Sequence, residues 1–351
     1  MSFHGSYNPE DVTFLLKPAQ IGFVDVDEKE RLIQSGTRHY SEMISPEKVP
    51  GQAYMDLYDQ ALDRNAGRLK GDIERLADMI VDHVGQRVTL VSLARAGTPI
   101  GVLLQRHMVR QGIDSQHYSV SIIRGRGIDK VAMAQIERDR GREGIVFVDG
   151  WTGKGAITDE LTMTLEGTGI DPVLAVVADP AGRATISATT DDYVIPSGIL
   201  NGIVSGLISR SVLNDDVVGP GDFHACLHQT HLSEHDRSND FIDAVESSAS
   251  ELRGAVWTPE SANIAKRVSR QVVLDIMEQH GVTDINRVKP GIAEATRAIL
   301  RRIPDAVHVR DIDDVDTLHV VHLATEAGVP VLSLPSDCPY RAVTVIRTLG
   351  E

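Results

Sequence analysis

The fold class is decided by one stretch of the sequence, Ile145-Val-Phe-Val-Asp149-Gly-Trp-Thr-Gly-Lys-Gly-Ala-Ile157. Its first four residues are all apolar, which is typical of a buried strand in a parallel sheet. A glycine-rich loop follows, and a helical pattern begins at Ala156. Backbone N–H groups and the positive end of a helix dipole converge in such a loop, so the stretch predicts an anion-binding site. The alternative is a tight turn that needs glycine only for its backbone angles.

The overall composition limits the classes of protein to consider. A chain of 351 residues is long enough for two domains. Two cysteines are too few for a disulfide framework. No apolar run approaches the roughly 18 residues of a membrane span, and the N-terminus lacks a signal-peptide pattern. We therefore expect a soluble protein in a reducing, cytoplasmic setting, with no membrane partner.

Charge is unevenly distributed along the chain. The net charge of −15 argues against non-specific wrapping of nucleic acid. Residues 262–351, however, hold 11 Lys or Arg against 12 Asp or Glu, a net charge of only −1. This asymmetry indicates two parts with different partners.

Strand and helix patterns alternate through the first part of the chain. Patterns typical of strands cover 88–93, 117–123 and 172–178 besides the opening stretch, and helices are expected at 51–65, 68–84, 99–110, 130–140 and 156–167. This order predicts an α/β fold with a parallel sheet and helices on both faces. Residues 1–50 read as an irregular extension, in which 39–43 is either a surface cap or a lid.

Three glycine-bearing loops follow strand ends, at 94–98, 124–129 and 150–155. Ligands of parallel sheets bind beyond the carboxyl ends of the strands, so these loops should share one rim. They carry four cations in an otherwise acidic part of the chain, which predicts an anionic small ligand: Arg95, Arg124, Arg126 and Lys154. The loop at 150–155 is no Walker A motif, because Val148 replaces its first glycine and Gly155 replaces its Ser or Thr.

These loops resemble those of phosphoribosyltransferases in the runs Phe147–Gly155, Leu93–Thr98 and Ser121–Gly127. More closely, the chain resembles a bacterial family of phosphoribosyltransferase-like proteins labelled StiP and associated with tellurite-resistance gene clusters. The residues that carry this second resemblance are His39–Met43, Val91–Gly101, Ile122–Asp129, Val148–Ala156 and Ile195–Ser197.

The resemblance implies binding of phosphoribosyl pyrophosphate (PRPP) or another ribose-5-phosphate compound. It further implies Mg²⁺-dependent phosphoribosyl transfer to or from a base or nucleotide-like substrate. Asp149 would orient the ribose and take part in holding Mg²⁺ with the pyrophosphate, while Arg95, Arg124 and Arg126 would stabilise the departing charge. The implied phosphate and ribose contacts are Ala96, Gly97, Thr98, Gly150, Thr152, Gly153, Lys154, Gly155 and Ala156.

Two alternatives to transfer stay open. Ordinary phosphoribosyltransferases carry an acidic pair where this chain has Asp149-Gly150, which favours a non-catalytic, RNA-binding regulator that senses a ribose phosphate. The less favoured alternative is a cysteine protease, a label that the StiP family also carries. It would have to rest on Cys226 or Cys338, and neither lies in a recognisable protease signature.

Four histidines form a dense cluster at spacings of 4, 3 and 4: His224, His228, His231 and His235. On a helix these spacings place all four on one face. We interpret this face as polar surface rather than a metal site, because neither an HExxH motif nor paired cysteines accompany it.

A second domain is expected to begin at residue 256, giving domains of 1–255 and 256–351. Helices are predicted at 262–280, 291–302 and 315–327, with strands at 306–309 and 329–333. The run Val288–Arg297 resembles the Pelota and L7Ae-like RNA-binding fold, which implies contacts with structured RNA by Lys289, Gly291, Glu294 and Arg297. Arg301 and Arg302 extend this basic face. The alternative interpretation is that the face is basic surface that binds no ligand. A homo-oligomer also stays possible.

Overall fold

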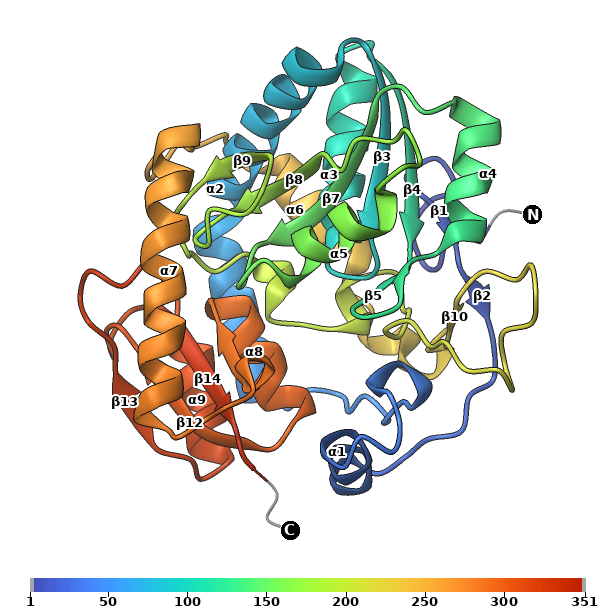
Figure 1. Ribbon diagram of the computed structural model, residues 1–351. Helices are drawn as coiled ribbons and strands as arrows, with labels where there is room; N and C mark the ends of the chain where they lie inside the picture. The colour runs from blue at the N-terminus through green and yellow to red at the C-terminus, as the bar shows by residue number, and fades with distance from the viewer. Residues whose placement is uncertain (1–2, 349–351) are drawn as a thin grey trace.

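The computed structural model describes residues 3–348 and contains a large parallel sheet at the centre of the N-terminal part (Figure 1). All neighbouring strands of this six-stranded sheet are parallel. Their spatial order is β1 (Thr13–Leu15), β4 (Asp114–Val120), β3 (Arg87–Leu93), β7 (Ile145–Trp151), β8 (Leu174–Ala178) and β9 (Ile186–Thr189). The prediction of a parallel α/β architecture is confirmed.

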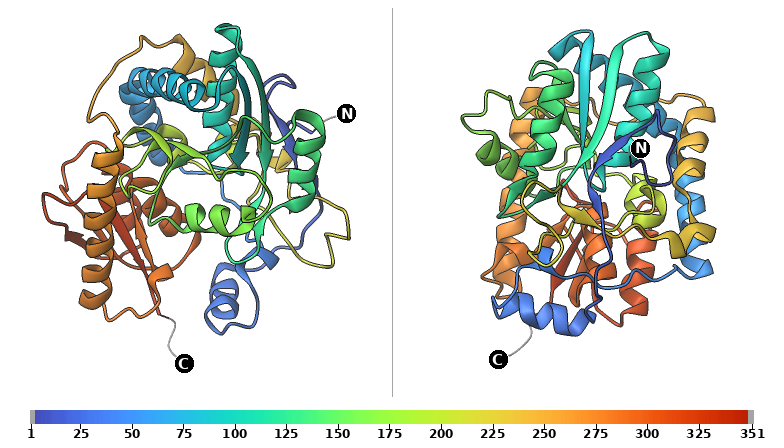
Figure 2. Two further views of the ribbon diagram at one scale, coloured as in Figure 1. Left: turned by 45° about the horizontal axis from the view of Figure 1, so that its top comes forward. Right: turned by 90° about the vertical axis from the view of Figure 1, so that its right-hand side faces the viewer.

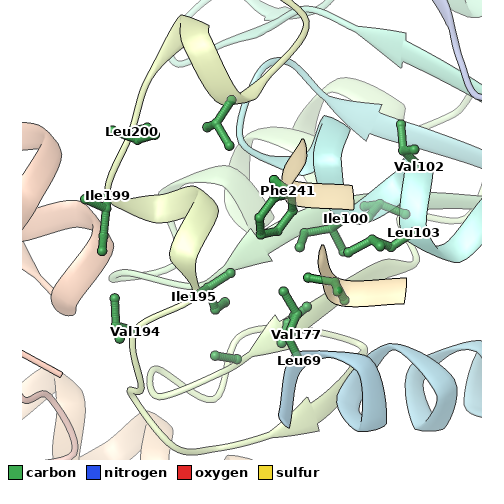
Figure 3. Packing of buried hydrophobic residues seen from close by; sticks show 14 of the residues in the cluster. Leu69, Ile100, Val102, Leu103, Val177, Val194, Ile195, Ile199, Leu200 and Phe241 are labelled. Atoms are coloured by element: carbon green, nitrogen blue, oxygen red, sulfur yellow. The ribbon is translucent and has the colours of Figure 1, made fainter. Parts of the chain in front are cut away.

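Both faces of the large sheet are buried. On β7, Val146 and Val148 belong to one hydrophobic cluster and Ile145 and Phe147 to another, as expected for side chains that alternate across a strand. The first cluster takes in α2 (Gln52–Val84), α3 (Gly97–Arg110) and α6 (Ser238–Ser247), and the second takes in α4 (Lys130–Arg140) and α5 (Ala156–Leu165). Figure 3 shows the first cluster, where Ile100 and Leu103 of α3 lie near Phe241 of α6.

Helix α2 corrects the prediction of two helices at 51–65 and 68–84. It runs unbroken for 33 residues, with Gly67 in its middle. Gly67 and Gly71 do not break α2; they allow the segment at 249–251 to pack closely against the helix. A Cβ on Gly67 would lie 2.6 Å from the carbonyl oxygen of Ala249, and one on Gly71 would lie 2.4 Å from that of Glu251.

The C-terminal unit is a small α/β structure around a second sheet. This sheet has the order β11 (Val288–Pro290), β14 (Ala342–Ile346), β12 (Pro304–Val309) and β13 (Val331–Ser333). Its helices are α7 (Pro259–Gln279), α8 (Ile292–Arg301) and α9 (Leu318–Glu326). The three helices and the strands β12 and β13 match the predicted elements, whereas β11 and β14 lie where no strand was expected.

The two units share one continuous hydrophobic core. Leu69 of α2, Ile292 of α8 and Val320 of α9 belong to the same buried cluster. In both views of Figure 2 the C-terminal unit, coloured orange to red, lies directly beside the large sheet. Within residues 3–348, no helix combines the length and apolar character needed to cross a membrane.

Smaller elements complete the chain. They are β2 (Lys17–Pro18), α1 (Val26–Gln34), β5 (Ile122–Ile123), β6 (Gly127–Ile128), β10 (Ala225–Cys226) and the 3₁₀ turns Tyr40–Glu42, Pro196–Gly198, Gly202–Val204, Thr230–His235 and Ile285–Arg287. The strand β10 and the turn after it replace the helical face expected for the four histidines. His224 instead bonds the Ser121 hydroxyl at 2.8 Å, and the ring of His228 lies 5.3 Å from that of Phe3.

Candidate functional site

A cavity of about 370 Å³ lies where the loops of the large sheet meet the C-terminal unit. Among residues 3–348, two carboxylates line it, Asp149 and Glu294. Nine basic residues line it as well: Lys29, Arg95, Arg124, Lys154, Arg210, Lys289, Arg297, Arg301 and Arg302. The loops predicted to hold a small anion and the helix predicted to contact RNA therefore form the walls of one cavity.

Asp149 faces this cavity from β7. Its carboxylate accepts the N–H of Gly150 at 2.8 Å. Burial raises the pKa of Asp149 to about 7; the Gly150 hydrogen bond and the positive charge of Arg297 oppose that rise, and the negative charge of Glu294 adds to it. The carboxyl is thus close to half ionised near neutral pH.

Lys154 reaches across the junction between the units. Its Nζ donates to the carbonyl oxygen of Val288 at 2.7 Å, and the hydroxyl of Tyr340 donates to the carbonyl oxygen of Gly153 at 2.7 Å. Burial lowers the pKa of Lys154 to about 7, assisted by the nearby positive charge of Lys289. Burial likewise lowers the pKa of Lys289 to about 8.

The remaining residues of the 150–155 loop shape it. Thr152, 4% exposed, donates its hydroxyl to Asp179 at 2.5 Å. Asp179 also accepts the backbone N–H of Arg183 at 2.8 Å and the indole N–H of Trp257 at 3.1 Å. Thr152 therefore holds the loop through its hydroxyl and also lines the cavity, as do Gly153, Gly155 and Ala156. Gly150 does not line the cavity.

The loop after β3 contributes Arg95 and Ala96 to the cavity. The guanidinium of Arg95 pairs with Glu47 and donates to the carbonyl oxygen of Ile208 at 2.8 Å. Gly97 and Thr98 lie outside the lining. A Cβ on Gly97 would stand 2.1 Å from the carbonyl oxygen of Val148, so this glycine allows the loop to pack on β7.

Tyr40 connects the N-terminal extension to the loop at 124–129. Its hydroxyl accepts the N–H of Arg124 at 2.9 Å, and the guanidinium carbons of Arg124 and Arg210 lie 5.8 and 5.6 Å from its ring centroid. Arg124 lines the cavity and donates to Asn286 at 3.0 Å, whereas Arg126 pairs with Glu42 outside the lining.

The start of α8 is already occupied by a carboxylate. Asp192 accepts the N–H of Ile292 at 3.1 and 3.2 Å and the N–H of Arg341 at 2.7 Å. Gly291 is buried at this junction and does not line the cavity. The side chains of α8 and β11, rather than the helix N-terminus, are therefore the groups that face a ligand.

Arg297 is the most available of these side chains. Its guanidinium carbon lies 4.7 Å from the ring centroid of Trp151, and its Nε is buried without a hydrogen-bond partner. Nε of Arg301 is also buried and unpartnered. Among residues 3–348, no ion pair involves either side chain, but a terminal nitrogen of Arg301 donates to the side-chain oxygen of Asn201. Arg297 is therefore the freer of the two to bond a ligand, and Arg301 keeps an unpartnered Nε.

Sequence reasoning did not place Lys29 as a cavity residue, and it left Tyr40 in the segment 39–43, interpreted as either a surface cap or a lid. Lys29 lies on α1, more than sixty residues from the first of the three loops, and no periodicity connects the two. The signal for Arg301 and Arg302 was the basic face of the predicted helix. The packing that brings Arg301 and Arg302 to the loops of the large sheet is tertiary, and no local sequence pattern indicates it.

The described residues offer no ready metal or thiolate site. Between residues 3 and 348 there is no group of three His, Cys, Asp or Glu side chains placed to hold a metal ion. Cys226 is fully buried and Cys338 is 2% exposed, and burial raises their pKa values to about 12 and about 11. No hydrogen bond joins either thiol to a histidine ring in this part of the chain.

The fold and cavity define a class, an α/β protein that combines a parallel sheet with a small second unit around a cationic pocket. Residues 5–246 match the family described as tellurite-like stress resistance cysteine protease StiP, and residues 267–348 match the PELOTA RNA binding domain. A curated relative named cysteine protease StiP, from Acinetobacter baylyi, is 43% identical over 365 residues, covering 99% of this chain and 95% of the relative. The chain belongs to the StiP family.

These comparisons confirm the predicted StiP membership, its link to tellurite resistance and the C-terminal Pelota unit. They also correct the predicted function. Phosphoribosyl transfer, with PRPP as substrate and a glycosyltransferase as the enzyme class, is wrong, because the family and the relative are both named as cysteine proteases, which are hydrolases. The name cysteine protease supports the protease alternative, which was the least favoured interpretation of the sequence.

Proposed function

We propose that the cavity binds a terminal phosphate of a structured RNA that the Pelota unit holds. One observation carries this proposal: nine basic side chains and two carboxylates line a single cavity in a chain of net charge −15. Such a concentration of buried positive charge costs free energy unless an anion compensates it. The match of residues 267–348 to an RNA-binding domain supports RNA as the source of the anion.

The size of the cavity favours an RNA end over a continuous duplex. About 370 Å³ is at the lower end of the range for small-ligand pockets, enough for a phosphate with its terminal nucleotide. Arg297 and Arg301 have free guanidinium nitrogens for charge-assisted hydrogen bonds to phosphate oxygens.

The matched pair Arg297→Gln and Arg138→Gln tests the proposal. Arg138 is exposed on α4, away from the cavity. We expect Arg297→Gln to weaken binding of an end-phosphorylated RNA hairpin about tenfold or more, since a hydrogen bond to a charged group contributes ~1.5–3 kcal/mol. Arg138→Gln should leave the dissociation constant unchanged in fluorescence anisotropy. Equal effects of the two variants would contradict the proposal.

Peptide hydrolysis is the second candidate, favoured by the name of the relative. A thiolate mechanism would need Cys226 or Cys338 to become exposed and to meet a base, because burial holds both as neutral thiols. Assays on an unstructured protein substrate should compare the wild type with Cys226→Ala and Cys338→Ala. Hydrolysis lost in one variant alone would assign the nucleophile, and hydrolysis retained in both would exclude a cysteine mechanism.

Three finer predictions also stay proposals. They are a domain boundary between residues 255 and 256, a phosphoribosyltransferase-like topology of the large sheet, and Mg²⁺ held by Asp149 together with ligand oxygens. Limited proteolysis tests the first, and comparison of an experimental structure with known folds tests the second. RNA titrations with Mg²⁺ and with a chelator test the third, since Asp149 is the one carboxylate of the large sheet in the described lining.

A further inference from the structure

Lys154 places a primary amine inside a cavity built for anions. The amine is held by the carbonyl oxygen of Val288 at 2.7 Å, and its loop is anchored through Gly153 to Tyr340. Gly155 ends the loop in the left-handed region, with φ of +90°, and starts α5. The side chain is thus positioned by both units rather than free in solvent.

Charged groups from several elements surround this amine. Lys289 of β11 and Arg124 of the 124–129 loop disfavour its protonation, while Glu294 of α8 and Asp284 favour it. With burial as the largest effect, the pKa falls to about 7. At pH 7 about half of the Lys154 side chains are then neutral, against roughly one in three thousand for a lysine with the ordinary pKa of 10.5. Neutral lysine amines are nucleophiles.

We propose that Lys154 is a covalent site that forms a reversible imine with aldehydes that carry a phosphate or carboxylate. The Lys154 nitrogen bonds to the carbonyl carbon, and the carbonyl oxygen takes up a proton to give a carbinolamine. The C–O bond then breaks, a C=N bond forms, and the oxygen leaves as water with both hydrogens of the amine. The step is redox-neutral and needs no co-reactant.

The anionic group of the aldehyde supplies the selectivity. Lys289 and Arg297 line the same cavity as Lys154, and Arg297 has an unpartnered Nε. A phosphate or carboxylate bound there brings the carbonyl to the amine, so an intermolecular step becomes effectively intramolecular. Imine formation at Lys154 is separate from the proposed RNA binding. It depends on the same basic lining, which would bind the anionic group of the aldehyde.

Borohydride trapping with two matched probes tests the inference. Pyridoxal 5′-phosphate and pyridoxal carry the same aldehyde and differ in the phosphate. The full chain is incubated with each probe, reduced, digested and mapped by peptide mass spectrometry. We expect pyridoxal 5′-phosphate to label Lys154 ahead of every other lysine, and pyridoxal to label it about tenfold less, because pyridoxal lacks the phosphate that forms charge-assisted hydrogen bonds with the basic lining.

Two further readouts separate Lys154 from an ordinary lysine. Labelling at Lys154 should rise through about pH 7 and level off, while labelling of exposed lysines should keep rising toward pH 10. Lys154→Arg should abolish the major labelled peptide, and Lys130→Arg, at an exposed lysine of α4 outside the cavity, should retain it. Labelling confined to exposed lysines, or equal labelling of Lys154 by the two probes, would overturn the inference. The wild-type map and pH profile decide the matter even if Lys154→Arg folds poorly.

Discussion

Asp149 of β7 and Lys154 of the loop that follows lie five residues apart, and both titrate near neutral pH for the same reason. Burial penalises whichever form is charged, so it raises the pKa of the carboxyl to about 7 and lowers that of the amine to about 7. Below pH 7 the amine is positive and the carboxyl neutral. Above pH 7 the amine is neutral and the carboxyl negative.

The cavity should therefore bind anions more tightly at pH 6 than at pH 8. Rising pH removes a positive charge at Lys154 and adds a negative charge at Asp149, and both changes oppose an anion. Calorimetric titration with inorganic sulfate checks this, because the charge of sulfate is constant over that range. Asp149→Asn should reduce the pH dependence. Sulfate affinity that rises with pH would contradict the assignment of these two groups.

Asp192 should be a major contributor to stability. Its carboxylate accepts the N–H groups of Ile292 and Arg341 at the junction of the units. Asp192→Ala would leave the buried N–H of Ile292 and the part-buried N–H of Arg341 without this acceptor, at about 1–3 kcal/mol each, so we expect the free energy of unfolding in urea to fall by ~2–6 kcal/mol. Asp240→Ala, at a side chain that is 67% exposed, serves as the control. Equal changes in the two variants would refute this role.

At the scale of elements, β7 and its loop were predicted with their neighbours because each pattern is local. Four apolar residues, a glycine-rich loop and a helix start can be read directly from the chain. The single helix α2 was not predicted, since Gly67 resembles a break between two helices unless the crossing segment at 249–251 is known. Nor could the position of Thr152 be read from sequence, because its partner Asp179 lies beyond α5.

Gly97 is expected to tolerate no side chain. A Cβ there would stand 2.1 Å from the Val148 carbonyl oxygen, so Gly97→Ala must displace the 94–98 loop from β7. We expect the substitution to lower the free energy of unfolding by ~1–3 kcal/mol or more and to weaken anion binding through Arg95. At Gly22 an added Cβ meets nothing within 4 Å, so Gly22→Ala should be silent in both measurements.

For the whole molecule, the sequence indicated two parts but did not indicate how they pack against each other. The three loops were expected on one rim and the basic helix in a separate domain. Their closure into one cavity depends on contacts between residues a hundred or more positions apart, such as Lys154 with Val288 and Asp192 with Ile292. Local patterns carry no information on such docking.

The shared core predicts that the two units unfold together. Buried side chains of α2, α8 and α9 belong to one cluster, so loss of the C-terminal unit would expose the apolar face of α2. Differential scanning calorimetry of the full chain should show one cooperative transition. Two separate transitions would indicate that the units are independently stable, contrary to this expectation.

The most direct test of the cavity's role compares one RNA hairpin with and without a terminal phosphate on the wild-type chain. Both forms present the same fold to the Pelota unit and differ only in the group assigned to the cavity. We expect the phosphorylated hairpin to bind about tenfold or more tightly in fluorescence anisotropy, since bonds to a charged group contribute ~1.5–3 kcal/mol each. Equal affinities would show that the cavity does not bind the end of the RNA.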